Sequence, residues 1–356
     1  MCAIDTMNAT AQVLPSFETD LIGLTLEGQW RIETFRNEIA SGVIRIPTLR
    51  FDARGSDGQK GRVVVLDLRL DGNAPDELKD LELRLQVFNY QRQLVERLAN
   101  ERLRGIVRAL HTGSIAYPSA PLGRLYYLIF EWSEDDLRSQ VRLHDQFDEA
   151  YAIRILHQAA TALHELHFRE VAHQSLRPAD VLIFEDQAKL GELSCAVDGR
   201  KPRPDGAPIL DWTCAPPEVL YNAPLLSIND RMLIDLYQLG SLVAYLFSGT
   251  SMSTQLGQRL QPIHHWRHWT GSFPDALTYV NHAFSEVLHT LEPTLPAVCR
   301  AALMTALREL CSPDPTLRGH PSNLAGQGLQ SSTERYISLF DRLGKQAERA
   351  LRETSR

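Results

Sequence analysis

Hydrophobic residues in the first part of the chain come in short runs, whereas later ones recur at helical spacing. Up to about Asp71, apolar segments alternate with glycine and charge, and a β-branched run follows the turn-like segment 55–61. From residue 76 to about residue 100, apolar residues recur among charges: Leu81, Leu85, Phe88, Leu94, Val95 and Leu98. These patterns predict strands joined by hairpins, followed by one long helix.

The remainder of the chain shows fewer strand patterns and more helical ones. Apolar segments at 106–110 and 125–130 predict two further short strands. Helical periodicity predicts helices at 148–167, 232–247, 296–310 and 335–351. Region 250–293 is less regular and is expected to hold helices connected by loops. The pattern therefore predicts the α+β class, with a small strand-rich part before a larger, mainly helical part.

Composition and charge narrow the classes of function. The 356 residues are 44% hydrophobic, which suits a packed core, and the net charge of -7 provides no general attraction to nucleic acid or anionic membranes. No apolar run approaches the roughly 20 residues that a bilayer span needs. Residues 1–16 carry no secretory signal pattern. We therefore expect a cytoplasmic protein with no membrane span and no nucleic-acid partner.

The cysteine and lysine contents add two smaller expectations. The five cysteines have no C-x-x-C spacing, so they are expected to be free thiols in a reducing compartment. Arginine greatly outnumbers lysine, which is typical of proteins from GC-rich bacteria. Few lysines also leave few candidates for any lysine-dependent role.

A series of motifs follows in order through the second half of the chain. Residues 171–183 read Val-Ala-His-Gln-Ser-Leu-Arg-Pro-Ala-Asp-Val-Leu-Ile, and residues 188–194 read Ala-Lys-Leu-Gly-Glu-Leu-Ser. Further motifs are Ala-Pro-Pro-Glu-Val-Leu at 215–220, Asp-Leu-Tyr-Gln-Leu-Gly at 235–240 and Asp-Pro-Thr-Leu-Arg at 314–318. In the same order, the series resembles the catalytic loop, the metal-binding tripeptide, the A-P-E motif, the central helix and the closing D-P-x-x-R motif of eukaryotic-like Ser/Thr protein kinases.

The kinase resemblance implies a bilobal fold, with a small antiparallel β-sheet lobe that holds one long helix and a larger, mainly helical lobe. It implies an N-terminal extension (1–27), an N-lobe (28–131), a C-lobe (132–330) and a C-terminal helix (331–356). It also implies a vestigial nucleotide cleft in which Phe130 is the gatekeeper. The cleft residues under this resemblance are Val65, Phe130, Asp180, Leu182 and Glu192.

Most positions that carry out chemistry in kinases hold other residues here. The catalytic aspartate falls on Ser175, the strand lysine on Asp67 and the helix glutamate on Gln91. Serine is no base at neutral pH without its own activator, and an aspartate would repel a triphosphate. The expected phosphate-binding loop contains one glycine, Gly42, whereas close approach of the backbone to phosphates requires two or three. The resemblance therefore implies a pseudokinase.

Several positions in the expected cleft keep alternatives open. His173 is expected to pack in the hydrophobic column between the lobes rather than to act as a base. Arg69 shares a strand face with Asp67 and is an alternative partner for phosphates. Asp180 and Glu192 replace the metal-binding asparagine and aspartate, and their carboxylates suit Mg²⁺. The alternative, which we favour, is that both are hydrophilic substitutions on a cleft wall, so that no cofactor is required and weak ATP and Mg²⁺ binding stays open.

The positions with architectural roles in kinases are kept. Glu218 and Arg318 stand where kinases form a buried ion pair between the segment after the activation loop and the last helices. Asp235 stands where an aspartate near the start of the central helix accepts backbone N–H bonds from the catalytic loop. These three residues are therefore expected to hold the fold together.

A retained frame beside a degraded site predicts a protein-binding scaffold or allosteric regulator with a protein partner, and the oligomeric state stays open. One alternative is a divergent nucleotide-dependent transferase that holds metal with Glu192 and Asp180. Another is an ATP sensor without hydrolysis. The His-Trp run at 264–269 is expected to form a surface or partner-binding loop rather than a metal site, because no third ligand stands near its histidines.

Overall fold

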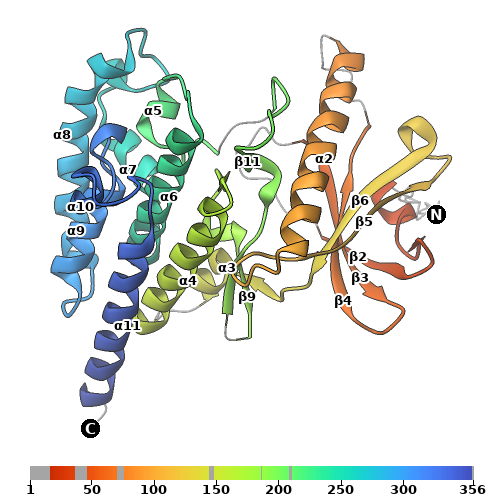
Figure 1. Cartoon of the computed structure of the whole chain (residues 1–356), viewed down its shortest axis with the longest axis horizontal. Coiled ribbons are helices and arrows are strands. Elements are labelled where there is room, and N and C mark those ends of the chain that lie inside the picture. The colour runs from red at the N-terminus through yellow and green to blue at the C-terminus, as the bar shows by residue number, and fades with distance from the viewer. Residues whose placement is uncertain are drawn as a thin grey trace, which may run out of the picture.

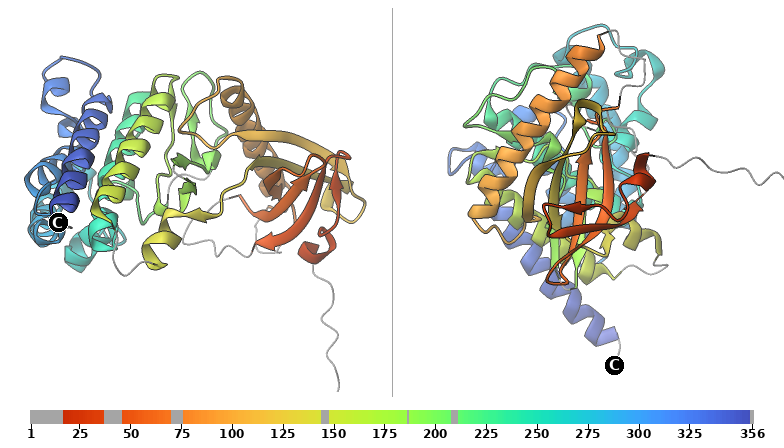
Figure 2. Two further views of the ribbon diagram at one scale, coloured as in Figure 1. Left: turned by 90° about the horizontal axis from the view of Figure 1, so that it is seen from below. Right: turned by 90° about the vertical axis from the view of Figure 1, so that its right-hand side faces the viewer.

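The computed structural model describes residues 17–36, 46–69, 76–143, 148–185, 187–207 and 211–354. Gly42 of the expected phosphate loop, Cys2 and most of the expected N-terminal extension lie outside the described residues. Figure 1 shows the large sheet and α2 at one end of the molecule, and helices α4 to α11 at the other. The two views of Figure 2 show the same arrangement from below and from the sheet end.

The helices are α1 (Phe17–Asp20), α2 (Glu77–Asn100), α3 (Leu137–Leu143), α4 (Glu149–His167), α5 (Pro217–Leu220), α6 (Ile228–Ser248), α7 (Met252–Arg259), α8 (Phe273–Leu291), α9 (Arg300–Leu310), α10 (Pro321–Leu324) and α11 (Glu334–Thr354). The strands are β1 (Thr25–Leu26), β2 (Trp30–Arg36), β3 (Thr48–Gly55), β4 (Lys60–Leu66), β5 (Ala109–Ala116), β6 (Arg124–Glu131), β7 (Asp135–Asp136), β8 (Val171–Ala172), β9 (Val181–Phe184), β10 (Gln187–Leu190) and β11 (Val197–Asp198).

Six strands form one antiparallel sheet in the order β1-β2-β3-β4-β6-β5. The hairpin between β3 and β4 closes at Gly55, whose N–H donates to the Gln59 carbonyl (2.8 Å). Gly58 in this turn has φ of +85°, a conformation that favours glycine. A three-stranded sheet, β10-β9-β7, and the β11–β8 pair lie nearer the helices. The coarse prediction of a mixed α and β chain with an antiparallel sheet is confirmed.

One expected strand lies later in the chain than the sequence pattern indicates. We expect a strand at 106–110, but β5 begins at Ala109. Ile106 instead forms an isolated parallel bridge with Leu190, and the Val107 N–H donates to the Leu190 carbonyl (2.9 Å). The apolar pair therefore ties the region before β5 to β10, a contact that local sequence cannot reveal.

The two faces of the sheet pack into different buried clusters. Val63 and Val65 of β4 pack on one face, with Phe51 of β3 and Tyr127 of β6. Leu66 belongs to the second cluster, which joins α2 to the main helices of the other end. Because side chains alternate along a strand, even-numbered residues of β4 face α2 and odd-numbered ones face away from it.

The predicted starts of α2 and α4 are each accurate to one residue, whereas the predicted start of α6 is not. The Asp76 carboxylate caps α2, and the Asp148 carboxylate caps α4, each one residue before the helix. Helix α6 begins at Ile228 rather than at 232, because Ser227 and Asp230 form a reciprocal capping box. Asp235 therefore lies well inside α6, and its expected position at the helix start is wrong.

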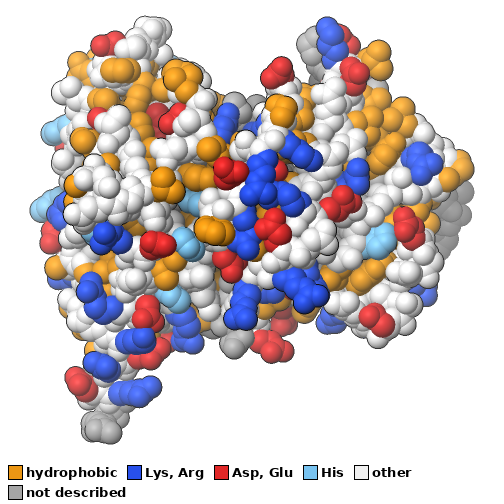
Figure 3. Space-filling model, in the orientation of Figure 1, with side chains coloured by type: hydrophobic (Ala, Val, Ile, Leu, Met, Phe, Trp, Pro, Cys, Tyr) orange, Lys and Arg blue, Asp and Glu red, His pale blue; other side chains and the backbone are white. Residues whose placement is uncertain are grey.

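The last helix packs along α4 through a buried stripe. Tyr336, Phe340, Leu343 and Ala347 of α11 are all buried. The projecting end of α11 carries charges of both signs in Figure 3. In the part of the chain that the structure describes, no single helix is long and apolar enough to cross a membrane, and the one pair that passes by length and composition, α6 with α7, is bent by 80°.

Replacing Glu309 with glutamine is expected to change how stability depends on pH. Burial raises the pKa of Glu309, whereas the hydrogen bond from Tyr336 (3.1 Å) and nearby His320 lower it. A carboxyl group with a raised folded pKa favours the native state at low pH, and that contribution is lost as pH rises through the folded pKa. As pH rises above 4.5, the ordinary pKa of glutamate, the unfolding temperature of Glu309→Gln should therefore rise relative to that of wild type.

Thermal unfolding over a series of pH values checks this expectation. Glu292→Gln, at an exposed glutamate, is the control and should show no such gain. A difference between Glu309→Gln and wild type that stays constant across the series would contradict the expected sign.

Candidate functional site

A cavity of about 730 Å³ lies between the six-stranded sheet, α2 and the segment 177–194. Six of the residues selected from sequence line it: Asp67, Gln91, Phe130, Asp180, Leu182 and Glu192. Val65, His173 and Ser175 are not among the described lining residues. The fold thus brings together side chains from positions 67 to 192 in one cavity, although it does not bring every expected residue there.

The prediction that Val65 faces the cleft is wrong by one position. Val65 is fully buried on the opposite face of the sheet, and Val64 lines the cavity. The next side chain on the cavity face is Leu66, which packs toward α2. The strand position that faces α2 therefore holds an apolar side chain, and no cation stands there.

Asp67 lies just beyond the end of β4, and its carboxylate is paired with arginine. Arg69 donates to it through Nε (2.9 Å) and Nη2 (2.7 Å), and also donates to Glu18 (2.6 Å). These contacts raise the pKa of Arg69, the hydrogen bond to Asp67 most, against the lowering effect of burial. Arg69 is therefore held by two carboxylates, which argues against its replacing the lysine at a phosphate.

The segment that resembles the catalytic loop is tied to the backbone around it. His173 is fully buried, its Nδ1 accepts the Ser175 N–H (3.2 Å), and its Nε2 lies 2.8 Å from the Gly191 carbonyl. A carbonyl accepts only, so Nε2 carries the ring proton. Both ring nitrogens are thus used in structural hydrogen bonds, and neither is placed to move a substrate proton.

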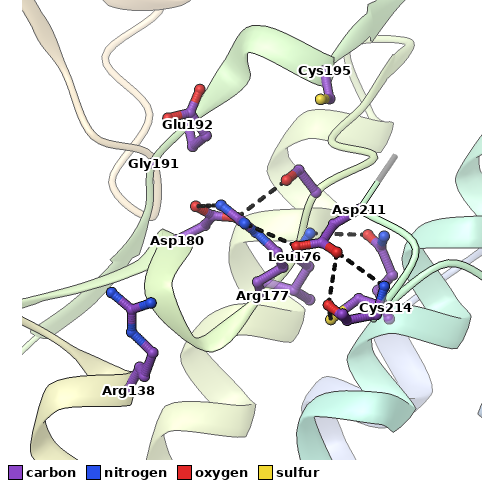
Figure 4. Close-up of polar contacts among 12 residues, drawn as sticks. Arg138, Leu176, Arg177, Asp180, Gly191, Glu192, Cys195, Asp211 and Cys214 are labelled. Atoms are coloured by element: carbon purple, nitrogen blue, oxygen red, sulfur yellow. Dashed lines mark hydrogen bonds and ion pairs between the residues drawn. The ribbon is translucent and has the colours of Figure 1, made fainter. Parts of the chain in front are cut away.

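Arg177 forms the centre of a buried ion network in this loop. Its guanidinium donates to both oxygens of Asp180 (2.6 and 2.7 Å) and to Asp211 (3.0 Å). Figure 4 shows the guanidinium between these two carboxylates. Burial lowers the pKa of Arg177, but the two carboxylates outweigh it and the pKa is raised. Ser175 Oγ also donates to Asp180 (3.1 Å), so the residue in the catalytic base position bonds to the one in a metal position.

Glu192, the other candidate metal ligand, forms an ion pair with Arg50 of β3. Arg50 stands opposite Val64 in the sheet, on the face that lines the cavity. Glu192 has φ of +57°, which is uncommon for a residue other than glycine. The ion pair links the large sheet to the segment after β10 across the cavity.

The metal hypothesis finds no geometric support in the described part of the chain. No group of three or more His, Cys, Asp or Glu side chains there is arranged to hold a metal ion. Asp180 and Glu192 both line the cavity, but each is paired with an arginine. Two carboxylates engaged in this way favour the interpretation as cleft-wall substitutions.

Sequence reasoning gave no role to three residues of this site: Arg50, Arg177 and Asp211. The sequence does hold a signal for Arg177, because it directly precedes a 3₁₀ turn that ends at Asp180, and side chains three apart in such a turn lie on the same side. No comparable signal marks Arg50, which is 142 residues from Glu192.

The structure brings the residues with expected architectural roles into contact. Arg318 and Glu218 form a bidentate pair (2.6 and 2.8 Å), with Arg318 fully buried. Asp235 accepts the N–H groups of His173 and Gln174, both at 2.7 Å. The Asp235 carboxylate thus binds the backbone of the segment that resembles the catalytic loop. It does so from inside α6 rather than from the first turn of the helix.

The side chains of the His-Trp run at 264–269 are half-buried or exposed, and its two tryptophans pack against the chain. Trp266 and Trp269 both pack edge-on against Tyr221, which follows α5. The His264 ring stacks on Tyr279 with centroids 3.5 Å apart. These aromatic contacts give most of the run a packing role.

No model of a known protein family matches the chain. The chain is similar to cell division control protein 2 homolog 2 of Trypanosoma brucei brucei, with 28% identity over 141 residues, and to probable cyclin-dependent kinase 8 of Dictyostelium discoideum, with 24% identity over 144 residues. Each match covers 36% of this chain, and the chain spans 39% and 36% of the two relatives. These partial matches indicate a protein-kinase-like fold.

Proposed function

We propose that this chain is a bilobal, kinase-like protein that transfers no phosphate and acts by binding another protein, as a scaffold or allosteric regulator. The observation that supports this best is the pairing of Asp180 with Arg177 and of Glu192 with Arg50. A divalent cation at these carboxylates would have to displace charge-assisted hydrogen bonds, one of them bidentate.

The residues at the other positions that carry out chemistry in kinases also argue against phosphoryl transfer. Phosphoryl transfer depends on positioned charge, so each missing group removes transition-state stabilisation. Ser175 supplies no carboxylate base, and loss of general-base help is worth about 10²- to 10⁴-fold in rate. Leu66 and Asp67 supply no cation for the phosphates, and Gln91 supplies no carboxylate to orient one. The divergent transferase is therefore the less favoured alternative.

A nucleotide sensor that needs no metal is the second candidate. The cavity of about 730 Å³ falls within the usual size range of small-molecule sites. Three further arginines line it: Arg36, which pairs with Asp52, Arg138, which lies 3.6 Å from Asp136, and Arg62. Guanidinium groups bind phosphate without a metal ion, so the cavity would not need a metal ion to bind an anionic ligand.

Thermal unfolding with ATP, with and without Mg²⁺ or Mn²⁺, tests the cleft. We expect no metal-dependent rise in unfolding temperature and no transfer of label from γ-labelled ATP to a panel of protein acceptors. A rise with ATP alone would favour the sensor. Transfer of label that is lost in Glu192→Ala but kept in Glu134→Ala, which removes another carboxylate lining the cavity, would contradict the proposal.

Affinity purification of the tagged chain from its own cells tests the binding part of the proposal. A scaffold should retain the same partner whether the bait is wild type or Glu192→Ala. A partner that is retained only when ATP is present would favour the sensor. Recovery of no partner by cross-linking under either condition would count against the scaffold.

A further inference from the structure

A group of exposed arginines lies between the end of α2 and the start of β5. Arg102, Arg104 and Arg108 are all exposed. In the described part of the chain, no ion pair joins their side chains to a carboxylate, whereas neighbouring Arg169 pairs with Glu101. Figure 3 shows Lys and Arg side chains gathered over the middle of this face, between α2 and α4. On a chain with a net charge of -7, this is a local excess of positive charge.

The backbone that carries these arginines is held by hydrogen bonds to its neighbours. The Gly105 N–H donates to the Glu165 carboxylate of α4 (3.0 Å). The Arg108 N–H donates to the Glu131 carboxylate (2.9 Å), and the Glu131 N–H donates to the Arg108 carbonyl (3.0 Å). A Cβ on residue 105 would stand 2.6 Å from that of Ala162, so only glycine allows the segment to pack this closely on α4. A partner therefore meets arginines on an ordered backbone, which lowers the entropy cost of binding.

Arg102 occupies a backbone position that favours glycine. Its φ is +53°, and it directly follows Glu101, the residue that caps the C-terminus of α2. Helices commonly place glycine at this position, because a Cβ is strained at positive φ. A cation near a helix C-terminus is favourable, but Arg97 already supplies one in the last turn of α2. An arginine at this position is therefore better explained by an interaction of its side chain than by the needs of the fold.

The chemistry of the group indicates a partner with carboxylates. A guanidinium group offers a planar fork of donors that matches the two oxygens of a carboxylate, and clusters of arginine recognise acidic segments of proteins. Guanidinium groups also attract the phosphates of nucleic acid, but DNA is charged along its whole length. It would meet Glu131 and Glu165, which lie beside the arginines, and the net negative charge of the chain. A short acidic segment avoids much of this repulsion.

We propose that Arg102, Arg104 and Arg108 bind an acidic segment of a partner protein. The proposal rests on the protein-binding role proposed for the chain, to which it adds the surface and the charge of the partner. Exposed ion pairs are individually weak, so the three arginines act together, and their contribution falls as salt rises. The site does not depend on whether the candidate cleft binds nucleotide.

Fluorescence polarisation with a short, labelled polyglutamate peptide tests the surface directly. The wild-type chain should bind this peptide more tightly than a polyglutamine peptide of the same length, and more weakly as salt is added. The triple variant Arg102→Gln, Arg104→Gln, Arg108→Gln should bind polyglutamate about tenfold more weakly than wild type does. Equal affinity of wild type for the two peptides, or unchanged affinity in the triple variant, would overturn the proposal.

Three exposed arginines of α11 provide a control with the same change in net charge. Arg342→Gln, Arg349→Gln, Arg352→Gln removes three positive charges from a different surface and should bind polyglutamate as wild type does. An equal loss in both triple variants would show attraction to net charge alone and would overturn the site. Unlabelled duplex DNA that displaces the peptide more effectively than unlabelled polyglutamate, at the same concentration of negative charge, would reject an acidic segment as the preferred partner.

The variant Arg102→Gly separates binding from folding. Glycine suits the positive φ, so the unfolding temperature should equal or exceed that of wild type, while the affinity for polyglutamate falls. A fall in the unfolding temperature would show that the Arg102 side chain serves the fold, and would overturn its role in binding.

Affinity purification separates failure of this surface from failure of the scaffold. With the tagged chain as bait in its own cells, the partner retained by wild type should be lost from the triple variant at 102, 104 and 108 and kept by the α11 control. A partner that both variants retain would leave the scaffold in place and overturn this surface. Absence of any partner on wild type would count against the scaffold, and the polyglutamate measurement would still decide whether the arginines bind acidic segments.

Discussion

Replacing Arg318 with methionine is expected to lower the free energy of unfolding by about 3 to 5 kcal/mol. Arg318 is fully buried, and Glu218 would be left in the interior without its bidentate partner. Arg318 also donates to the carbonyls of Leu233 and Ser312 (3.1 and 3.0 Å), which would lose a donor. Urea unfolding followed by circular dichroism measures the loss.

The double variant Arg318→Met, Glu218→Leu separates the ion pair from the rest of the site. Removing both charges should recover part of the loss, because no uncompensated charge stays buried. Lys345→Met, which breaks an exposed pair with Asp341 on α11, should leave stability unchanged within error. A single variant as stable as wild type, or a double variant as unstable as the single one, would contradict the role of the pair.

The sequence predicts helices with clear apolar periodicity and polar caps, because both signals are local. Helices α2 and α4 begin within two residues of their predicted starts for this reason. The run from Val63 to Leu66 is harder to place, because apolar residues lie on both faces of the sheet and no polar alternation marks one of them. A one-residue shift exchanges the two faces, so the alignment with the kinase strand motif predicts Val65 in the cavity, whereas Val64 lines it.

The candidate site could be predicted only as a set of positions. Motif spacing selects Asp180 and Glu192, and both line one cavity. It does not select Arg50, because pairing between distant segments depends on how the large sheet packs over the loop after β10. The interpretation of a carboxylate therefore depends on its partner. An unpaired carboxylate suggests a metal ligand, whereas one paired with arginine suggests part of a closed cleft wall.

Replacing Arg177 with methionine is expected to destabilise the protein by about 3 to 5 kcal/mol and to create a response to Mg²⁺ that wild type lacks. Asp180 and Asp211 are 3% and 1% exposed, and both would lose the guanidinium that now bonds to them. Asp211 keeps the N–H and hydroxyl of Thr213 (2.9 and 2.7 Å), but a hydroxyl does not replace a charge.

The Mg²⁺ response follows from the position of Asp180 on the cavity wall. With Arg177 gone, its carboxylate is the nearest site for a cation, and a bound ion stabilises the native state by mass action. Mg²⁺ should therefore raise the unfolding temperature of Arg177→Met and leave that of wild type unchanged. Arg138→Met removes a cation from the same cavity without exposing Asp180, so it should show no response.

The double variant Arg177→Met, Asp180→Asn decides whether the arginine occupies a former cation position. Without a carboxylate at 180, the Mg²⁺ response should disappear, and part of the lost stability should return because one buried charge has been removed. An equal Mg²⁺ response in wild type and Arg177→Met would mean that the guanidinium does not exclude cations. In that case the ion pairs at Asp180 and Glu192 could not explain an absence of phosphoryl transfer. The metal-dependent transferase would then be favoured over the scaffold.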